Sequence, residues 1–302
     1  MRQQIIPVVF LIGLVSSAGA QVPEPFQISV SVNLVVLNPA VRDRKGGFVS
    51  DLREGDFQVY EDGVRQSIKV FRHEDIPVTV GLVVDHSGSM KPKLNDVITA
   101  ARTFIQSSRP DDQMFVVNFN EKVTLSMPAI RIGDRSDALA LAVSDTPATG
   151  ETALYDATLQ AFSQLGAGGP DKKVLIVISD GGDNASAHTL AEVLKTAGQS
   201  SALVYTIGIF DDDDADRNPD ALSRLARATG GDAFFPRRNS EVVAICEGIA
   251  RDIRNQYTIG YVSSSAARAG LLRSIRLTAS APGHGKLLVR TRSGYIGGSK
   301  SQ

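Results

Sequence analysis

Four segments of the chain are apolar almost throughout, and each is followed by a stretch with helical periodicity. Strands that are apolar on both faces are typical of a parallel sheet that helices cover on both sides. The pattern therefore predicts a doubly wound α/β domain with a mainly parallel sheet, spanning residues 77–255. The predicted strands are Val78 to Val84, Met114 to Phe119, Val174 to Ser179 and Leu203 to Phe210.

Two of the predicted helices show the apolar spacing most clearly. One closes the domain from Glu241 to Arg254, where apolar residues recur around Cys246. Cys246 is the only cysteine of the 302 residues, so no intramolecular disulfide can form, and its helical setting favours a buried structural thiol. The other helix follows the first strand, and its apolar face consists of Leu94, Val97, Ile98, Ala101, Phe104 and Ile105.

Alternating apolar residues, typical of half-buried strands, flank this domain on both sides. They run from Ile28 to Val36, and then in two short runs between Phe57 and Phe71 that Asp62-Gly63 joins as a two-residue turn. A single hairpin is marginal alone, so we predict that residues 21–76 and 256–298 pair into one smaller β-sandwich, with the α/β domain inserted between them. Two separate β extensions are the alternative. The later alternation comprises Tyr257, Ile259, Tyr261, Ile275, Leu277, Leu287 and Val289.

The first twenty residues have the pattern of a secretory signal peptide. Arg2 precedes an apolar run from Ile5 to Val15, and the small residues Ala18-Gly19-Ala20 follow it. As a helix this run rises about 16 Å, against roughly 30 Å for a membrane core, so we predict cleavage after Ala20 rather than a membrane anchor. The mature chain is then expected to be exported, periplasmic or secreted, without a transmembrane segment. The formal net charge of -1 gives no reason to expect a nucleic acid partner.

Polar side chains follow two of the predicted strands directly. Asp85 follows the first strand, within Asp85-His86-Ser87-Gly88-Ser89, and Asp180 follows the strand that ends at Ser179. Because ligands bind at the carboxyl ends of strands in such sheets, both carboxylates point to one site. Gly88 lets the loop fold tightly so that Ser87 and Ser89 can face one point, and Thr152 adds another hydroxyl before a helix. These oxygens suit Mg²⁺, with Mn²⁺ or Ca²⁺ also possible.

Three motifs in this order resemble the von Willebrand factor type A domain family. They are Asp-x-Ser-Gly-Ser after the first strand, Gly-x-Thr-Ala-Leu-Tyr-Asp-Ala around Thr152, and Ser-Asp-Gly around Asp180. The resemblance covers roughly residues 77–255 and implies a metal-ion-dependent adhesion site. By that resemblance Ser87 and Ser89 bind the ion directly, whereas Thr152, Asp85 and Asp180 bind it directly or through water. The flanks, with Gly294-Tyr295 near the C-terminus, resemble those of bacterial exported proteins carrying this domain.

The resemblance implies an extracytoplasmic adhesion or protein-interaction module rather than an enzyme. In that family a carboxylate of the partner commonly fills the remaining coordination position, so a protein or glycan ligand with an acidic group is expected. Two alternatives stay open. One is a metal-dependent hydrolase, for which Glu151 or Asp183 is the visible general base, and the other is a structural scaffold with an unused ion site.

Four further patterns carry weaker expectations. His86 next to Ser87 does not suit a nucleophile and its base, and Gly166 to Gly169 precedes a strand, unlike a nucleotide-binding loop. The acidic run Asp211 to Asp214, with Asp216, is interpreted as a solvated loop, with a second, calcium-type ion site as the alternative. Asn184-Ala185-Ser186 matches the glycosylation acceptor pattern, which occurs often by chance.

Overall fold

The structure is a computed structural model that describes residues 34–73, 75–170, 172–210, 217–238, 240–265 and 270–297. Residues 33–302 form one compact unit, and it is this unit that is described below. The predicted signal peptide with its cleavage after Ala20, and the acidic segment Asp211 to Asp216, lie outside the described residues. Within the described ranges, no helix combines the length and apolar character that crossing a membrane requires.

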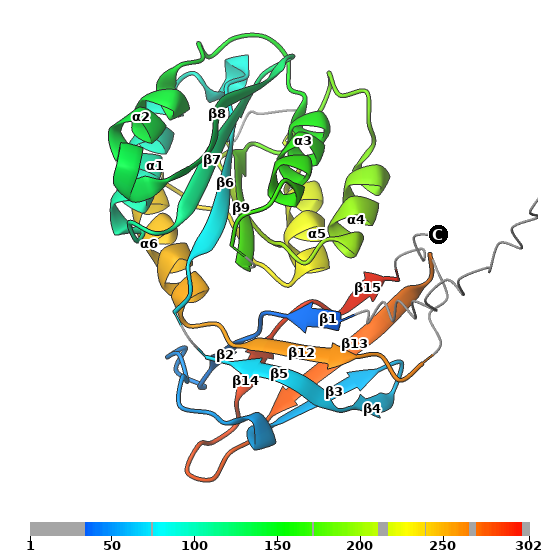
Figure 1. Cartoon of the computed structure of the whole chain (residues 1–302). Coiled ribbons are helices and arrows are strands. Elements are labelled where there is room, and N and C mark those ends of the chain that lie inside the picture. Colours follow the sequence, from blue (N-terminus) through cyan, green and yellow to red (C-terminus); the bar gives the residue numbers. More distant parts are fainter. Residues whose placement is uncertain are drawn as a thin grey trace, which may run out of the picture. The chain divides into compact units, whose positions relative to one another are not determined.

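The central sheet has six strands in the order β11-β10-β9-β6-β7-β8 (Figure 1). All neighbours are parallel except β7 and β8, which pair antiparallel. The strand order reverses at β6, because the chain places β7 on one side of β6 and β9 on the other. The strands are β6 (Val78–Asp85), β7 (Gln113–Phe119), β8 (Val123–Arg131), β9 (Lys172–Ser179), β10 (Leu203–Gly208) and β11 (Ala233–Phe234).

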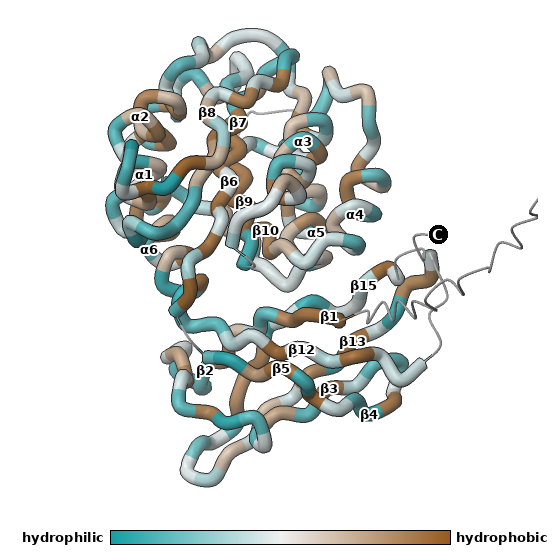
Figure 2. Tube along the Cα trace, viewed as in Figure 1, coloured by the Kyte–Doolittle hydropathy of each residue, from teal (hydrophilic) through white to brown (hydrophobic). Residues whose placement is uncertain are grey.

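Within the described ranges, six α-helices cover the two faces of this sheet (Figure 1). One hydrophobic core joins Val80, Leu82 and Val84 of β6 to α1, α2 and α6, while Val83 belongs to the core shared with α3, α4 and α5. Figure 2 shows the hydrophobic positions concentrated along β6 and β7. The helices are α1 (Leu94–Ser107), α2 (Ile132–Ser144), α3 (Leu154–Gly166), α4 (Leu190–Gln199), α5 (Pro219–Thr229) and α6 (Glu241–Arg254).

This arrangement confirms the predicted doubly wound, mainly parallel α/β sheet. The antiparallel edge strand β8, which runs from Val123 to Arg131, was not among the four predicted strands. Cys246 on α6 is buried in the first core, and burial raises the pKa of its thiol to about 12. The prediction of a buried thiol is therefore confirmed.

The flanking segments form antiparallel sheets that combine strands from both sides of the α/β domain. The sheets are β1-β12-β5, β15-β13-β3-β4 and β14-β2, and the first two share one hydrophobic core (Figure 1). The flanks therefore make one smaller β-sandwich, as predicted, rather than two separate extensions. The strands are β1 (Leu34–Leu37), β2 (Ala40–Arg42), β3 (Phe57–Glu61), β4 (Val64–Gln66), β5 (Ile68–Arg72), β12 (Thr258–Val262), β13 (Leu272–Ala279), β14 (Leu288–Arg290) and β15 (Gly294–Ile296).

The predicted two-residue turn at Asp62-Gly63 joins β3 to β4. Both residues have positive φ, 48° for Asp62 and 81° for Gly63, which is the conformation that this hairpin turn requires. The Asp62 carboxylate also accepts hydrogen bonds from the backbone and hydroxyl of Ser274 on β13. The turn thus anchors the hairpin to a strand from the opposite flank.

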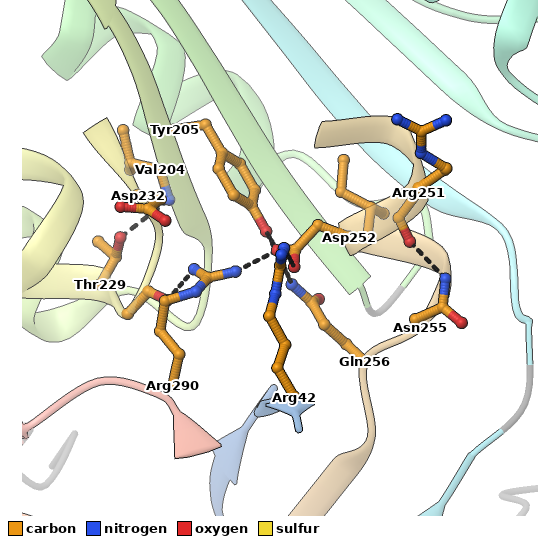
Figure 3. Close-up of polar contacts among 12 residues, drawn as sticks. Arg42, Val204, Tyr205, Thr229, Asp232, Arg251, Asp252, Asn255, Gln256 and Arg290 are labelled. Atoms are coloured by element: carbon orange, nitrogen blue, oxygen red, sulfur yellow. Dashed lines mark hydrogen bonds and ion pairs between the residues drawn. The ribbon is translucent and has the colours of Figure 1, made fainter. Parts of the chain in front are cut away.

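A buried carboxylate, Asp252, connects the last helix of the α/β domain to the β-sandwich. Figure 3 shows Tyr205, Arg42 and Arg290 converging on it. The Tyr205 hydroxyl donates to Asp252 Oδ2 at 2.5 Å, and the guanidinium of Arg42, from β2, donates to Oδ1 at 3.1 Å. Arg290, from β14, pairs with the same carboxylate. Burial alone raises the pKa of Asp252, but Arg290 and these hydrogen bonds bring it below its ordinary value.

We predict that Asp252→Asn destabilises the protein by about 3 kcal/mol, because it removes the charge that two arginines share inside the structure. Urea unfolding followed by circular dichroism measures the change. Asp220→Asn is the matched control: its side chain is 78% exposed and lies 3.8 Å from Arg224, so its effect should stay within about 0.5 kcal/mol. Equal stability of the two variants would contradict this account of Asp252.

Candidate metal centre

Asp85 and Asp180 lie at the same edge of the central sheet. Asp85 is the last residue of β6, and Asp180 directly follows β9, which pairs with β6 in parallel register. This is the point at which the strand order reverses, where ligands bind in open α/β sheets. Both residues are buried, with 0% and 2% of their surface exposed. The sequence-based expectation that these two residues share an edge agrees with this geometry.

Ser87 and Ser89 link the two carboxylates through one backbone N–H and two hydroxyl groups. Asp85 Oδ1 accepts from the Ser87 backbone N–H at 2.8 Å. Ser87 Oγ lies 3.1 Å from Ser89 Oγ, and Ser89 Oγ donates to Asp180 Oδ2 at 2.5 Å. Four of the five predicted site residues therefore form one continuous cluster.

Thr152, the fifth predicted residue, is held beside this cluster through its backbone. Its N–H donates to Asn184 Oδ1 at 2.8 Å, and its carbonyl accepts from the backbone N–H of Asn184 at 3.0 Å. The preceding loop is joined to the serine loop, since the Gly88 N–H donates to the Gly150 carbonyl at 3.0 Å. Among the described contacts, the Thr152 hydroxyl has no hydrogen bond to the other four residues. It is 6% exposed.

The glycine that this loop arrangement requires is Gly150 rather than Gly88. A side chain at Gly88 would make ordinary contact with the Gly150 carbonyl oxygen, at 3.5 Å. Gly150 instead has a φ of 79°, and a Cβ there would collide with the carboxylate of Glu121. The expectation that a glycine at position 88 makes the turn possible was therefore wrong. The positive φ that favours glycine occurs at Gly150, in the loop before Thr152.

Burial and mutual repulsion govern the charge of the two aspartates. Burial, followed by the charge of Asp180, raises the pKa of Asp85 to about 7, while hydrogen bonds from Ser179 and Ser87 act in the opposite direction. Ser179 Oγ donates to Asp85 Oδ2 at 2.5 Å. Among the described residues, no arginine, lysine or histidine forms an ion pair with Asp85 or Asp180. Within the described part of the chain the cluster is therefore acidic, and its two carboxylates have no ion-pair partner.

The donor set fits a hard divalent cation. Every side-chain donor in the cluster is a carboxylate or hydroxyl oxygen, which is what Mg²⁺, Mn²⁺ and Ca²⁺ prefer. Two carboxylates balance a divalent charge, and hydroxyl ligands add no further charge. The described part of the chain contains no group of three or more His, Cys, Asp or Glu side chains placed to hold a metal. This site would depend on hydroxyl groups as well as on its two acids.

Other polar residues near the site have structural roles that the sequence did not reveal. Asp183 Oδ2 accepts from the Tyr155 N–H at 2.9 Å and from Ser186 Oγ at 2.6 Å, so it caps the start of α3. His86 is fully buried, and neither ring nitrogen has a hydrogen-bond partner among the described residues. Burial lowers the pKa of His86, and it makes no hydrogen bond with Ser87. This geometry agrees with rejecting a nucleophile and base pair.

We predict that Asp85→Asn stabilises the metal-free protein, and more so at pH 8 than at pH 5. The pKa of Asp85 is about 7 in the folded state, against an ordinary value of 3.8. Between these two pH values the folded state keeps the carboxyl proton, whereas the unfolded state has released it. Wild-type stability therefore falls as pH rises from about 4 to 7, by at most about 4 kcal/mol, and asparagine abolishes this fall. Thermal melts in chelator at both pH values measure it.

Asp137→Asn, an exposed substitution on α2, is the control and should show no such pH dependence. A stability difference between Asp85→Asn and wild type that is the same at pH 5 and pH 8 would refute the stated cause.

Sequence relatives of known description cover parts of this chain. It is 26% identical over 226 residues to inter-alpha-trypsin inhibitor heavy chain H2 of Mus musculus, an alignment covering 69% of this chain and 22% of that protein. It is 30% identical over 177 residues to an uncharacterized protein of Synechocystis sp., covering 56% of this chain and 40% of the other. The chain thus spans less than half the length of either relative.

Solved structures share the fold at low sequence identity. A von Willebrand factor type A protein from Catenulispora acidiphila has a TM-score of 0.55 at 16% identity, with 81% of this chain and 74% of that chain covered. The corresponding domain of the type V pili tip protein Mfa5 from Porphyromonas gingivalis has a TM-score of 0.50 at 13% identity, with 59% and 95% covered. At these identities the similarity shows the fold alone.

The sequence model of the von Willebrand factor type A domain matches residues 79–245. This match covers more than half of the 302 residues and includes all five residues of the candidate metal centre. The chain belongs to the von Willebrand factor type A domain family.

Proposed function

We propose that Asp85, Ser87, Ser89, Thr152 and Asp180 bind a divalent cation, Mg²⁺ in the first place and Mn²⁺ or Ca²⁺ as alternatives. The observation that carries the proposal is the pair of buried carboxylates, linked through Ser87 and Ser89, with which no cationic side chain of the described residues forms an ion pair. Burying two such carboxylates without a counterion is unfavourable, and a divalent cation offsets the cost. The family membership supports the same assignment.

Each side chain of the site has a distinct task in this proposal. Ser87 and Ser89 supply hydroxyl ligands, which contact each other and Asp180, and Asp85 and Asp180 supply the negative charge. Ser179 and the Gly182 N–H, which donates to Asp180 Oδ1 at 3.1 Å, fix the orientation of the carboxylates. When bound, the cation supplies a coordination position that attracts an additional acidic group.

The biological role that follows is an extracytoplasmic adhesion or protein-interaction module. The partner is a protein or a glycan that presents an acidic group to the site. A pilus tip protein and a minor pilin from Streptococcus sanguinis share the fold, the latter with a TM-score of 0.50, which supports a role at the cell surface. We propose that the protein is exported and that its signal peptide is cleaved after Ala20. N-terminal sequencing of the exported protein tests this, because the mature chain should begin at Gln21.

The geometry favours binding over hydrolysis at this site. Asp183, one of the two residues considered as a general base, uses Oδ2 to cap α3. Glu151, the other, is exposed on the loop before Thr152. The substitution Glu151→Gln therefore separates the two functions, because a hydrolase would lose turnover whereas metal binding would persist.

We predict that isothermal titration of Mg²⁺ into the chelator-stripped protein shows saturable binding that Asp85→Ala abolishes. The alanine removes one of the two charges that balance the ion. Glu151→Gln is the matched control from the same region and should change the affinity by less than about threefold, since this side chain is screened by solvent. Saturable binding that survives in Asp85→Ala would disprove the assignment.

A further inference from the structure

A second site lies at the opposite end of β9, away from the candidate metal centre. A partly open cavity of about 360 Å³ is lined by residues of the sheet β1-β12-β5 and by residues that begin β9 and precede β10. This volume falls within the range of roughly 300–1,000 Å³ that is typical of small-molecule sites. Its wall combines apolar and basic side chains, namely Leu34, Val36, Val70, Arg72, Lys172 and Lys173.

The apolar part of the cavity comes from one face of the three-stranded sheet. Gly260 of β12 lies between Val36 of β1 and Val70 of β5 in the strand register. Gly260 has no side chain, and its neighbours close over it: a Cβ there would lie 3.0 Å from Val70 Cβ and 3.2 Å from Leu34 Cδ1. The apolar wall of the cavity is therefore formed by the side chains of Leu34, Val36 and Val70. Val35 and Leu37 contribute instead to the core of the β-sandwich.

The basic part of the cavity contains a buried cation without an ion-pair partner. Lys172 is 5% exposed, and its ammonium donates to the carbonyl of Ile253 on α6. Lysine has three donors, and no described carboxylate forms an ion pair with this one. Burial, followed by the charge of Arg254, lowers the pKa of Lys172 to about 8, while the charges of Asp75, Asp252 and Asp112 act in the opposite direction. A buried ammonium is unfavourable unless an anion pairs with it.

The carboxylates around Lys172 are already paired with arginines. Asp112 pairs with Arg254, and Asp252 pairs with Arg290. Asp75 lies 3.0 Å from Arg109 and 3.0 Å from Arg254. Among the described residues, Lys172 is therefore a positive charge without a carboxylate of its own, and Lys173 and Arg72 add to it at the cavity wall. Among the described residues, no acidic side chain lines the cavity to repel an anion.

We propose that this cavity binds a small monocarboxylate with an apolar body, of the fatty-acid kind. The carboxylate interacts with Lys172 and the apolar body packs against Leu34, Val36 and Val70. The single buried cation of the cavity wall, Lys172, matches the single negative charge of a monocarboxylate. The hydroxyls of Ser201 and Thr258 also line the cavity and can donate further hydrogen bonds to the ligand carboxylate. This site is independent of the proposed metal centre and uses the other end of the same strand.

Titration of octanoate into the purified protein tests the proposal, with acetate and 1-octanol as matched probes. Acetate carries the charge without the apolar body, and octanol the body without the charge. Octanoate should bind saturably, and both other probes at least tenfold more weakly. Equal affinity for octanoate and octanol would overturn the role of Lys172.

The variant Lys172→Met retains an unbranched apolar side chain but removes the charge. We expect at least a tenfold loss of octanoate affinity together with an unchanged or raised melting temperature, because an unpaired buried cation has been removed. Lys195→Met, at an exposed position on α4, is the control and should bind octanoate as wild type does. Wild-type affinity in Lys172→Met would overturn the proposal.

A second variant keeps the test decisive if Lys172→Met does not fold. Ser201→Phe adds a ring at an exposed loop position on the cavity wall and should weaken octanoate binding at least tenfold without unfolding the protein. Full octanoate affinity in this variant would place the ligand elsewhere and refute the assigned cavity.

Discussion

The parallel pairing of β6 with β9 is the constraint on which the site depends. In this register Val84 lies opposite Ile178, so the next residues, Asp85 and Ser179, end their strands side by side and Asp180 follows at once. The Ser179 hydroxyl then reaches Asp85, and the serine loop after β6 reaches Asp180. A shift of one residue between these strands would turn their side chains to opposite faces and separate the two carboxylates.

Buried charges of opposite sign lie at the two ends of β9. Among the described residues, the two aspartates buried at its carboxyl end form no ion pair with a cationic side chain, and Lys172, buried at its amino end, forms none with a carboxylate. Between them the strand is apolar and covered by helices on both faces. Each unbalanced charge therefore lies where the sheet ends and side chains from loops or neighbouring sheets can complete a binding site.

Sequence patterns correctly predicted the features that depend on residues close together in the chain. Buried strands, their following helices, the Asp62-Gly63 turn and the alternating flanks all have short-range signals, and aspartates directly after two strands identified the edge of the sheet. Ser179 was missed as a site residue, although it is a polar residue that closes an otherwise apolar segment. Asp183 was noticed as an acid, but its capping of Tyr155 depends on how two loops meet, which spacing does not encode.

Such sequence patterns could not predict contacts between segments that are far apart in the sequence. Asp252 is joined to Arg42, Tyr205 and Arg290, which lie 210, 47 and 38 residues away in the sequence. The cavity beside Lys172 likewise forms where the β-sandwich meets the start of β9, and its walls come from both flanks and from the α/β domain. Neither feature has a motif, because each arises from the way in which the flanking strands pair around the inserted domain.

The most direct test of the metal assignment is anomalous diffraction from crystals soaked in Mn²⁺. We expect one strong anomalous peak within about 2.5 Å of Ser87 Oγ and Ser89 Oγ, with Asp85, Asp180 and Thr152 around it directly or through water. A peak at any other group of side chains, with none at this edge of the sheet under saturating Mn²⁺, would contradict the assignment of these five residues as the metal site.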